Sequence, residues 1–442
     1  MGTFIILWLG QMASAVGSSM TYFALTLWVW QQTQSATAIA LILFFYQLPQ
    51  IAIALFSGLL VDRVSRKRLL LLSDSGAACC TLSVGLLAAA HILQIWHIYL
   101  IAAIIGCFGN IQSLTYSVII PAIVPKQHHT RAISMGAMLH YGAGILAPAL
   151  AGILYPHFGL LGITLIDLAT FLIAILTLLA LSIPKTQSQD SGEETGSAKP
   201  DQQLWQNVTF GFRYIASHPS LLAMVFALSA FSFVNNIGET LYQPLILART
   251  GGNGQILGMV VAASGIGGVI GAIGLSLWSG FRRRVFGLLL GFIGTGFSHL
   301  LLGIGQFPAI WAIARFGVSL HNPLIFSSYM AIWYAKIAPD LQGRVLAADY
   351  LIGLVIESLA SLAAGLLADR IFTPAMQSGT WVFRLLSPVV GVGGGSGIAL
   401  LYVIAAIFIV LIGVGGFTIG QLRAAEALMP DYKAVEAQPR SR

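Results

Sequence analysis

Residues 58–68 read Gly-Leu-Leu-Val-Asp-Arg-Val-Ser-Arg-Lys-Arg and contain the first charged side chains of the chain. No charge precedes Asp62, and the 61 uncharged residues before it are enough for two membrane spans of about 20 residues each and a turn. A further apolar stretch begins at Leu69. We therefore predict that residues 58–68 form a basic turn between the second and third spans of a membrane protein.

The composition of the whole chain supports this prediction. Of its 442 residues, 57% are hydrophobic and only 8% are charged, whereas soluble domains carry about 25% charged residues. The apolar runs are long and continuous, which is typical of membrane helices and not of the alternating strands of a membrane barrel. The 48 glycines suit helices that pack closely through small residues. We predict an all-α, multi-pass membrane protein.

Turn residues separate twelve apolar runs, each long enough to be a transmembrane helix. The expected spans are 4–30, 37–61, 69–92, 98–124, 130–155, 159–183, 219–247, 254–280, 285–306, 308–335, 344–370 and 396–422. Residues 371–395, rich in glycine, are expected to form a long loop before the last span.

A hydrophilic stretch at 184–203 divides the spans into two sets of six. We expect an N-terminal six-helix bundle at 1–183, a cytoplasmic linker at 184–218, and a C-terminal six-helix bundle with a short cytoplasmic tail at 219–442. Within the linker, five apolar side chains share one helical face, which predicts a short interfacial helix on the inner leaflet. These residues are Leu204, Trp205, Val208, Phe212 and Ile215.

The distribution of basic residues predicts the orientation in the membrane. If the N-terminus is cytoplasmic, Arg249, Arg370 and Arg384 lie outside and Arg315 lies within a span, so the other 18 of the 22 lysines and arginines lie inside. Both termini are then cytoplasmic, and the protein is expected in the cell membrane. The net charge of +7 reflects this topology and gives no support to nucleic-acid binding. The N-terminus lacks the features of a cleaved signal peptide, so we expect the first span to be retained.

An internal repeat supports the division into halves. The fifth predicted helix runs from Arg131 to Gly152 and the eleventh from Arg344 to Gly365, and both pairs of residues differ by 213 positions. Parallel repeats of six helices occur in one class of transporters. The similarity between 58–63 and 365–370 is not part of this repeat, because the order of the spans places the two segments on opposite sides of the membrane.

Residues 58–68 resemble the loop signature of the major facilitator superfamily, G-x-L-x-D-R-x-G-R-K/R, with Ser65 in place of the second glycine. Helix five weakly resembles the exporter signature of that superfamily. The matching positions are Ser134, Ala143, Gly144, Ala147, Pro148, Ala151 and Gly152. The junctions 121–125 and 339–345 resemble the branch of macrolide, siderophore and peptide-natural-product exporters. The resemblance implies two pseudo-symmetric six-helix bundles, transport of a small molecule, and a monomer in the lipid bilayer.

The loop signature also suggests a cytoplasmic gate, formed by Gly58, Asp62, Arg63, Arg66 and Lys67. Asp62 is placed to cap the positive N-terminal end of a neighbouring helix, and we expect this to be helix eleven near Arg344. Arg63 and Arg66 are expected to pair with Asp74 or Asp349. The alternative is that these charges only orient the protein in the membrane.

The phosphate-binding loop of ATP-driven proteins contains a glycine followed by a lysine. No lysine of this chain follows a glycine, so we expect transport to be either passive or driven by an ion gradient. Ionisable residues within spans are functional candidates. The candidates for proton coupling are Glu357, Glu239, Asp167 and Asp74. Glu357 lies midway through its span with only serines nearby, so it leads; the alternative is a hydrogen-bonded structural acid.

Glu239 and Arg315 lie at similar depth in helices seven and ten, which predicts an ion pair that acts either as an outer gate or as a structural contact. Asp167 has no evident partner in the sequence. The intramembrane histidines, His140, His299 and His321, are expected to be hydrogen-bonded packing residues.

The resemblance implies that helices one, four, seven and ten line a central cavity, and each carries a polar stripe. The candidate residues are Gln11, Ser14, Ser18 and Tyr22; Asn110, Ser113 and Ser117; Asn235, Asn236, Glu239 and Gln243; and Arg315, Ser319, Asn322 and Phe326. Amides, hydroxyls and aromatic rings suit an amphiphilic organic cargo. The alternative is that these groups only bond helix to helix.

The sequence therefore favours a secondary transporter that exports an amphiphilic natural product, siderophore or drug by alternating access, with protons as the coupling ion. An importer or an uncoupled facilitator is the alternative. An enzyme would need a catalytic constellation, and a receptor would usually carry an additional soluble domain; the sequence shows neither. The three cysteines are expected to be buried thiols, and no metal or cofactor is expected.

Overall fold

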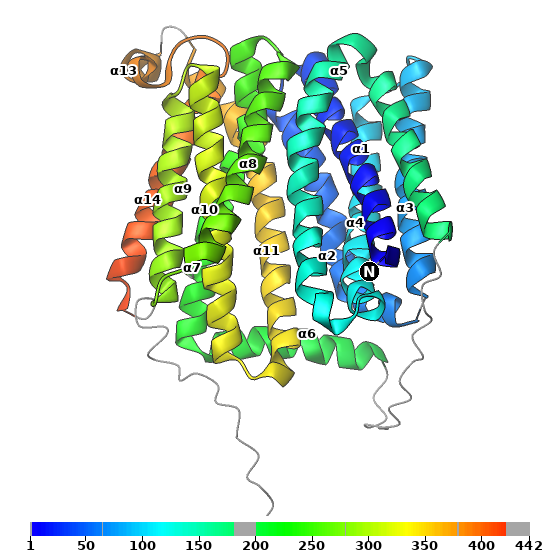
Figure 1. The fold of residues 1–442 in the computed structure, drawn as a ribbon. Coiled ribbons are helices and arrows are strands. Elements are labelled where there is room, and N and C mark those ends of the chain that lie inside the picture. Colours follow the sequence, from blue (N-terminus) through cyan, green and yellow to red (C-terminus); the bar gives the residue numbers. More distant parts are fainter. Residues whose placement is uncertain (1, 64, 181–199, 279, 378–379, 421–442) are drawn as a thin grey trace, which may run out of the picture.

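The structure is a computed structural model that describes residues 2–63, 65–180, 200–278, 280–377 and 380–420. Some helical segments within these ranges, including 55–63 and 200–208, are described by their backbone alone. Across the described ranges all regular structure is helical. Figure 1 shows long helices side by side, running between one end crossed by α6 and another end that carries α13. We call these the α6 end and the α13 end.

The helices follow the order of the predicted spans. They are α1 Gly2–Thr33, α2 Ala36–Arg63, α3 Arg66–Ala89, α4 Ile95–Ile123, α5 His129–Ala180, α6 Pro200–Ser217, α7 Pro219–Thr250, α8 Gly254–Trp278, α9 Arg284–Ile304, α10 Pro308–Lys336, α11 Pro339–Leu367, α12 Thr373–Ala375, α13 Trp381–Val390 and α14 Ser396–Thr418. Proline begins α7, α10 and α11, where its missing N–H leaves no hydrogen bond unmade.

Ten helices in the described part of the chain are long and apolar enough to cross a membrane. The apolar part of α5, Gly142–Ala180, is counted once although it has 39 residues and would extend about 58 Å as one straight helix. Gly159 has non-helical angles, φ 60° and ψ −167°, and Figure 1 shows α5 doubling back at the α13 end. A positive φ costs glycine little, so α5 forms two antiparallel limbs. The helix α10 is not among the ten.

The segment 371–395 is not the long loop that the sequence predicted. A π-helical turn, η2 (Ala368–Phe372), continues α11, and α12 and α13 follow it. In α13, Trp381, Leu385 and Val389 are spaced by four residues and are all exposed. This spacing is typical of a short amphipathic helix and was available in the sequence.

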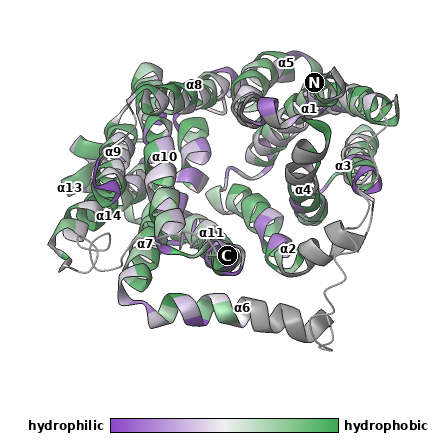
Figure 2. Ribbon diagram, turned by 60° about the horizontal axis from the view of Figure 1, so that its bottom comes forward, coloured by the Kyte–Doolittle hydropathy of each residue, from purple (hydrophilic) through white to green (hydrophobic). Residues whose placement is uncertain are grey.

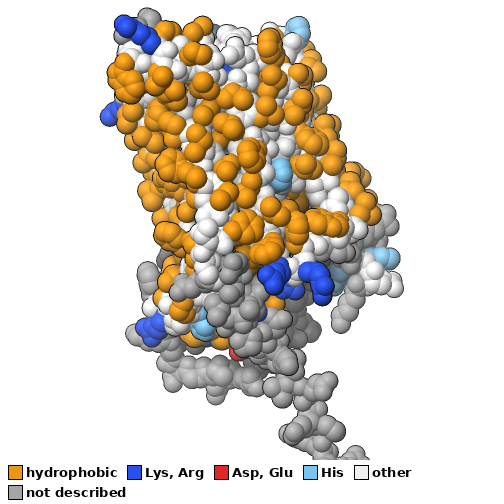
Figure 3. Space-filling model, turned by 90° about the vertical axis from the view of Figure 1, so that its left-hand side faces the viewer, with side chains coloured by type: hydrophobic (Ala, Val, Ile, Leu, Met, Phe, Trp, Pro, Cys, Tyr) orange, Lys and Arg blue, Asp and Glu red, His pale blue; other side chains and the backbone are white. Residues whose placement is uncertain are grey.

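The outer surface of the bundle is apolar over most of its height. In Figure 3 hydrophobic side chains cover the middle of the face, and lysine and arginine lie only toward its two ends. Large apolar side chains are strongly exposed, among them Leu277 at 83% and Phe226 at 75%. Such a surface is stable in lipid and not in water. The molecule is therefore a multi-pass membrane protein.

The helices pack in two groups. In the first group α1 packs against α5, and α2 and α3 pack against α4; in the second, α10 packs against α8 and α9, and α14 against α9 and α7. The groups meet along two long contacts, α5 with α8 and α2 with α11. Figure 2 shows the groups from the α6 end. We refer to them below as the N-terminal and C-terminal halves.

The predicted linker helix is present as α6, which runs across the end of the bundle (Figure 1). It packs against α11, where Gly211 lies against the backbone of Arg344, and the Arg344 guanidinium lies 4.8 Å from the ring of Phe210. Of the five apolar residues expected on one face, Ile215 is buried in protein and Phe212 is exposed. The side chains of the other three lie outside the described residues, so contact of α6 with the membrane stays a prediction.

The two ends of the predicted repeat lie at the contacts between the halves. A Cβ atom on Gly152 would lie 2.7 Å from the carbonyl oxygen of Gly254, at the start of α8. A Cβ atom on Gly365 would lie 2.6 Å from the Cα atom of Thr37, in the first turn of α2. In each case a glycine of one half allows its helix to touch the first turn of a helix in the other half.

Alanine at two glycines of α5 tests how tightly the halves fit. Gly152→Ala should lower stability by about 1–3 kcal/mol because its methyl group meets backbone atoms of α8. Gly144→Ala, whose added methyl group meets no atom within 4 Å, should leave stability unchanged or raise it slightly. The thermal unfolding midpoint of the purified protein in detergent measures both effects. Equal midpoints for the two variants would contradict the close α5–α8 contact.

Candidate functional site

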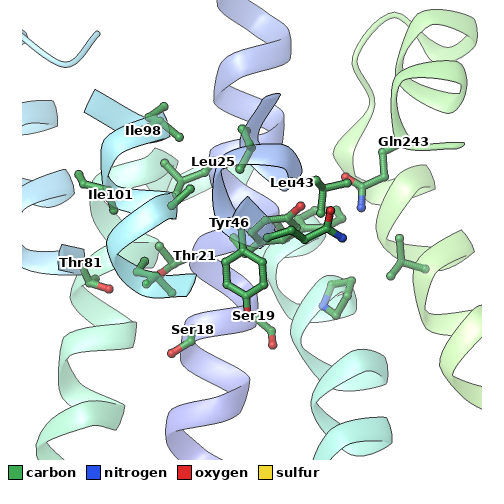
Figure 4. Close-up of a pocket in the computed structure, with 18 of the residues that line it drawn as sticks. Ser18, Ser19, Thr21, Leu25, Leu43, Tyr46, Thr81, Ile98, Ile101 and Gln243 are labelled. Atoms are coloured by element: carbon green, nitrogen blue, oxygen red, sulfur yellow. The ribbon is translucent and has the colours of Figure 1, made fainter. Parts of the chain in front are cut away.

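A cavity of about 530 Å³ lies between the two halves, and Figure 4 shows part of its wall. This volume is in the range of sites for small organic molecules. The lining residues are Ser18, Ser19, Thr21, Tyr22, Phe23 and Leu25 of α1; Ile42, Leu43, Tyr46 and Gln47 of α2; Ala77 and Thr81 of α3; Ile98, Ile101, Ala102 and Ile105 of α4; Pro148, Asp167 and Phe171 of α5; Asn236, Glu239, Thr240, Tyr242 and Gln243 of α7; and Val261 of α8.

The wall combines a few polar groups with many apolar ones. Figure 4 shows, among the residues of the wall, Ser18 and Ser19 of α1, Tyr46 of α2 and Gln243 of α7. Among the described lining residues the charged side chains are two acids, Asp167 from the N-terminal half and Glu239 from the C-terminal half. The site is therefore largely apolar, with one carboxyl group supplied by each half.

Glu239 forms the predicted ion pair with Arg315. The guanidinium donates from Nη1 to Oε1 at 2.7 Å and from Nη2 to Oε2 at 2.8 Å. Two parallel hydrogen bonds of this kind fix both the distance and the orientation of the groups. The Arg315 side chain is 4% exposed and that of Glu239 is 31% exposed, so the carboxylate faces the cavity and the guanidinium lies behind it.

Arg315 has further contacts with one side chain of α7 and one of α8. Arg315 lies 4.0 Å from the centre of the Tyr242 ring and also donates to the Ser264 hydroxyl at 3.2 Å. Close by, His299 bonds to Tyr402 and to Asn235 through its two ring nitrogens, each at 2.9 Å. His299 is thus the hydrogen-bonded packing residue that we expected.

The sequence offers no evident partner for Asp167, and the structure places three hydroxyl groups around it. Its side chain is fully buried, and the hydroxyls of Thr21, Thr81 and Ser18 donate to it at 2.7, 2.9 and 3.4 Å. These donors come from α1 and α3, which are distant from Asp167 in the sequence. Hydrogen bonds from several helices compensate for the loss of water around a buried carboxyl group.

Asp74 belongs to a separate cluster of neutral donors. The amides of Gln11 and Gln112 donate to its two carboxylate oxygens at 3.0 and 2.6 Å, and Gln112 also donates to Gln11 at 3.0 Å. Gln11 was expected on the cavity wall and instead bonds to this acid. Gln112 was not predicted, although it lies between two polar residues that were.

Glu357 differs from the other three acids. Its side chain is partly buried in the middle of α11. The two neighbouring serines bond to backbone carbonyls, Ser358 to Leu354 and Ser361 to Glu357 itself, at 2.8 and 2.9 Å. Within the described part of the chain, no side chain forms a hydrogen bond or ion pair with the Glu357 carboxylate.

The expected cytoplasmic gate is described only in part. The side chains of Gly58, Asp62 and Arg63 lie outside the described residues, while Arg66 and Lys67 lie at the start of α3. The Lys67 ammonium donates to the Leu179 carbonyl at 3.1 Å. Asp349, one of the two expected acidic partners, accepts a hydrogen bond of 2.6 Å from Tyr329. The latch therefore stays a prediction.

The motif predicted in helix five lies where the halves meet. Pro148 lines the cavity, and its carbonyl lies against Gly258 of α8. Gly152 makes the close contact with α8 described above, and the backbone of Gly144 lies near Gly265. Small residues at these positions bring α5 close to α8. Close packing of the two helices is therefore sufficient to explain the motif.

Of the predicted cavity residues, Ser18, Tyr22, Asn236, Glu239 and Gln243 lie on the wall. This cavity takes none of its described lining side chains from α10, and the expectation that helix ten also lines the transport pathway stays a prediction. Ser319 bonds to Ser264 of α8 at 2.5 Å, so this member of the α10 stripe makes a contact between helices. The other predicted residues lie elsewhere: Ser14 is buried, Asn110 bonds to Tyr350, and Ser113, Asn322 and Phe326 are exposed.

The other two intramembrane histidines are His321 and His140. His321 bonds to the Gly317 carbonyl of its own helix at 2.6 Å, while the side chain of His140, like that of Ser117, lies outside the described residues. Residues of the wall that the sequence did not reveal include Thr21, Tyr46, Gln47, Thr81 and Tyr242. In the sequence these residues are marked only by a polar or aromatic side chain within an apolar span.

Apolar helices that enclose a largely apolar cavity with a few polar groups between two halves are typical of a multi-pass membrane transporter. A family model described as the Major Facilitator Superfamily matches residues 7–354, and the chain belongs to this superfamily of transporters. The predicted family resemblance is thereby confirmed.

Relatives of known name are similar to the chain over most of its length. Macrolide efflux protein A of Streptococcus pyogenes is 23% identical over 372 residues, which cover 83% of this chain and 90% of that protein. The multidrug efflux pump Tap of Mycolicibacterium fortuitum is 21% identical over 83% of this chain and 90% of its own. The fold is similar to that of a bacterial homolog of the human lysosomal transporter Spinster in an inward-facing, unoccupied conformation, with a TM-score of 0.67, 15% identity and 97% of both chains covered.

Neutralising one or both members of the ion pair tests their interdependence. Arg315→Met should lower the free energy of unfolding by about 3–5 kcal/mol because it leaves the Glu239 carboxylate unpaired. Adding Glu239→Gln to that variant should recover much of the loss. The measurement is the thermal unfolding midpoint of the single and double variants in detergent. A double variant as unstable as the sum of both single variants would show that the pair contributes no coupling.

Proposed function

We propose that this transporter exports an amphiphilic small molecule by alternating access and is driven by proton antiport. The observation that carries the coupling is the partly buried Glu357 carboxylate, which has no described partner, while the other three intramembrane acids are bonded to neighbouring side chains. A carboxyl group that exchanges protons must be free to lose them and regain them. We rank Asp74, Asp167 and Glu239 below Glu357 as candidates for the proton carrier. Proton uptake at these three acids would disturb the hydrogen bonds or ion pair that they already form.

The cavity supports an amphiphilic cargo. Its wall offers the hydroxyls of Ser18 and Thr21, the amides of Gln47 and Gln243, and the ring of Tyr46 among mostly aliphatic side chains. Such a mixture favours an organic molecule with both apolar and polar parts. The names of the efflux relatives support the outward direction. An importer or an uncoupled facilitator is the alternative that the experiment below distinguishes.

We further propose twelve membrane crossings with both termini in the cytoplasm. The two limbs of α5 and the 29 residues of α10 would raise the number of spans from ten to twelve. Basic residues gather at the α6 end, which supports a cytoplasmic position for that end. They include Arg66, Lys67, Arg68, Arg213, Arg282, Arg283, Arg284, Lys336 and Arg344. The cell membrane is the proposed location, and residues 1–183 and 219–442 are the proposed bundles.

Proton movement tests the coupling directly. The purified protein is reconstituted into liposomes that contain a pH-sensitive dye, and amphiphilic compounds of positive, negative and no net charge are added in turn. We expect proton flux with one class of compound only, and we expect Glu357→Gln to reduce it to the level of empty liposomes. The same variant should retain exchange of labelled for unlabelled compound without a pH gradient, because that exchange needs no proton.

Asp340→Asn is the matched control. Asp340 is an exposed acid in the first turn of the same helix, so its neutralisation should leave proton flux unchanged. Full uphill transport by Glu357→Gln would contradict the role of Glu357 as the proton carrier. Compound movement without any proton flux would favour the uncoupled facilitator, and flux of compound inward with protons would favour the importer.

A further inference from the structure

The carboxylate of Asp369 joins the two halves at the α13 end. It accepts hydrogen bonds from the Ser35 hydroxyl at 2.6 Å and from the backbone N–H groups of Thr37 and Ala36 at 2.8 and 3.2 Å. Asp369 follows α11 in the C-terminal half, whereas the three donors belong to the first turn of α2 in the N-terminal half. A negative charge at a helix N-terminus is stabilised both by these donors and by the helix dipole.

Two features of α11 bring the carboxylate to this position. Gly365 lets α11 approach so closely that an added Cβ atom would lie 2.8 Å from the Cβ atom of Ala40. Directly after α11 the chain widens into the π-helical turn η2, which contains Asp369. Such turns are rare, and they occur frequently at functional sites.

The first turn of α2 also has a cap from within its own half, in which the Ser35 hydroxyl accepts a hydrogen bond from the Ala38 N–H at 3.2 Å. The equivalent helix start in the other half has, among the described residues, a local cap alone. The first turn of α8 is capped from within its own half, because the Asn253 side chain accepts hydrogen bonds from the N–H groups of Gln255 and Ile256 at 3.0 and 3.1 Å. Gly152 of α5 packs on α8 as Gly365 packs on α2, but the position 213 residues before Asp369 is Pro156. A local cap is therefore sufficient for a helix start in this fold, and the cap from Asp369 has the additional effect of tying the halves together.

We infer that Asp369 and the first turn of α2 form a lock that holds the α13 end of the transport pathway closed and must break whenever that end opens. This inference rests on the proposed alternating-access function. The related segment 58–63 ends α2 at the opposite end of the same antiparallel helix pair, and the sequence predicts that it caps α11 there. Asp369 is then a positioning residue, which controls the balance between two conformations and touches no cargo.

Distances between spin labels at the two ends measure this balance. With the three native cysteines replaced by alanine, one label pair is placed at Gln32 and Phe307 near the α13 end, and another at Ser65 and Gly343 near the α6 end; all four residues are exposed. The protein is measured in lipid nanodiscs without cargo or ion gradient. We expect Asp369→Ala to increase the ratio of long to short distances at the α13 end by about tenfold, as loss of a helix cap worth about 1.4 kcal/mol would, with the opposite change at the α6 end.

Milder variants protect the test against misfolding. Asp369→Asn keeps an oxygen that accepts hydrogen bonds and should shift the ratio less than alanine. Ser35→Ala removes one donor to Asp369 together with the local cap on the Ala38 N–H, and it should shift the ratio in the same direction. Asn253→Ala is the matched control, because it removes a comparable cap within one half and should leave both distance distributions unchanged. Arg370→Gln, which neutralises the exposed neighbour of Asp369, should also leave them unchanged.

Unchanged distances in Asp369→Ala, Asp369→Asn and Ser35→Ala would overturn the lock, and so would an equal shift in Asn253→Ala. Because neither cargo nor protons are present, this result is separate from the liposome experiment. A shift in the distances together with absent proton flux would retain the lock and reject only the proposed coupling.

Discussion

The close approach of helix backbones at two crossings is the constraint on which the rest of the structure depends. Inside a membrane, lipid is as apolar as the side chains, so helices gain stability from close packing and hydrogen bonds and gain little from the hydrophobic effect. Glycines at the α5–α8 and α2–α11 crossings meet this requirement by bringing the halves into backbone contact. The cavity lies between these crossings, and its acids come from both sides of it. Its shape therefore changes whenever the halves move relative to each other.

The buried polar groups divide into two kinds. Asp74, Asp167 and the pair of Glu239 with Arg315 are each bonded to side chains of other helices, and these bonds lie within one half. They hold each half together as a unit. A smaller set crosses from one half to the other, including Asn110 with Tyr350 at 3.3 Å and Ser361 with Gln47 at 3.4 Å. Two of the three hydrogen bonds of Asp369, at 2.6 and 2.8 Å, are shorter than these crossing bonds.

Much of the fold followed from the sequence because membrane spans depend on local composition. The spans, the linker helix and the ion pair all follow from apolar runs, amphipathic spacing and depth counted along single helices. The partners of Asp167 were missed because Thr21 and Thr81 lie 146 and 86 residues away, and rotation of one helix about its axis is set by neighbours that a single sequence does not reveal. The same limit applies to the polar stripe of α10, because the sequence did not reveal that Ser319 bonds to Ser264 of α8. The helix α13 was missed because glycine and proline at 371–395 suggested a loop, although the spacing of Trp381, Leu385 and Val389 was visible.

The pairing of Glu239 with Arg315 has a consequence for the response of the protein to membrane voltage. Moving one elementary charge through 100 mV changes the energy by about 2.3 kcal/mol. The pair has no net charge and its members are 2.7 Å apart, so it crosses the field as a short dipole and the field does little work on it. The pair itself therefore adds little voltage dependence to the rearrangement of the C-terminal half. Charge movement across the membrane during the transport cycle is then expected from groups that gain or lose a proton, or from the cargo itself.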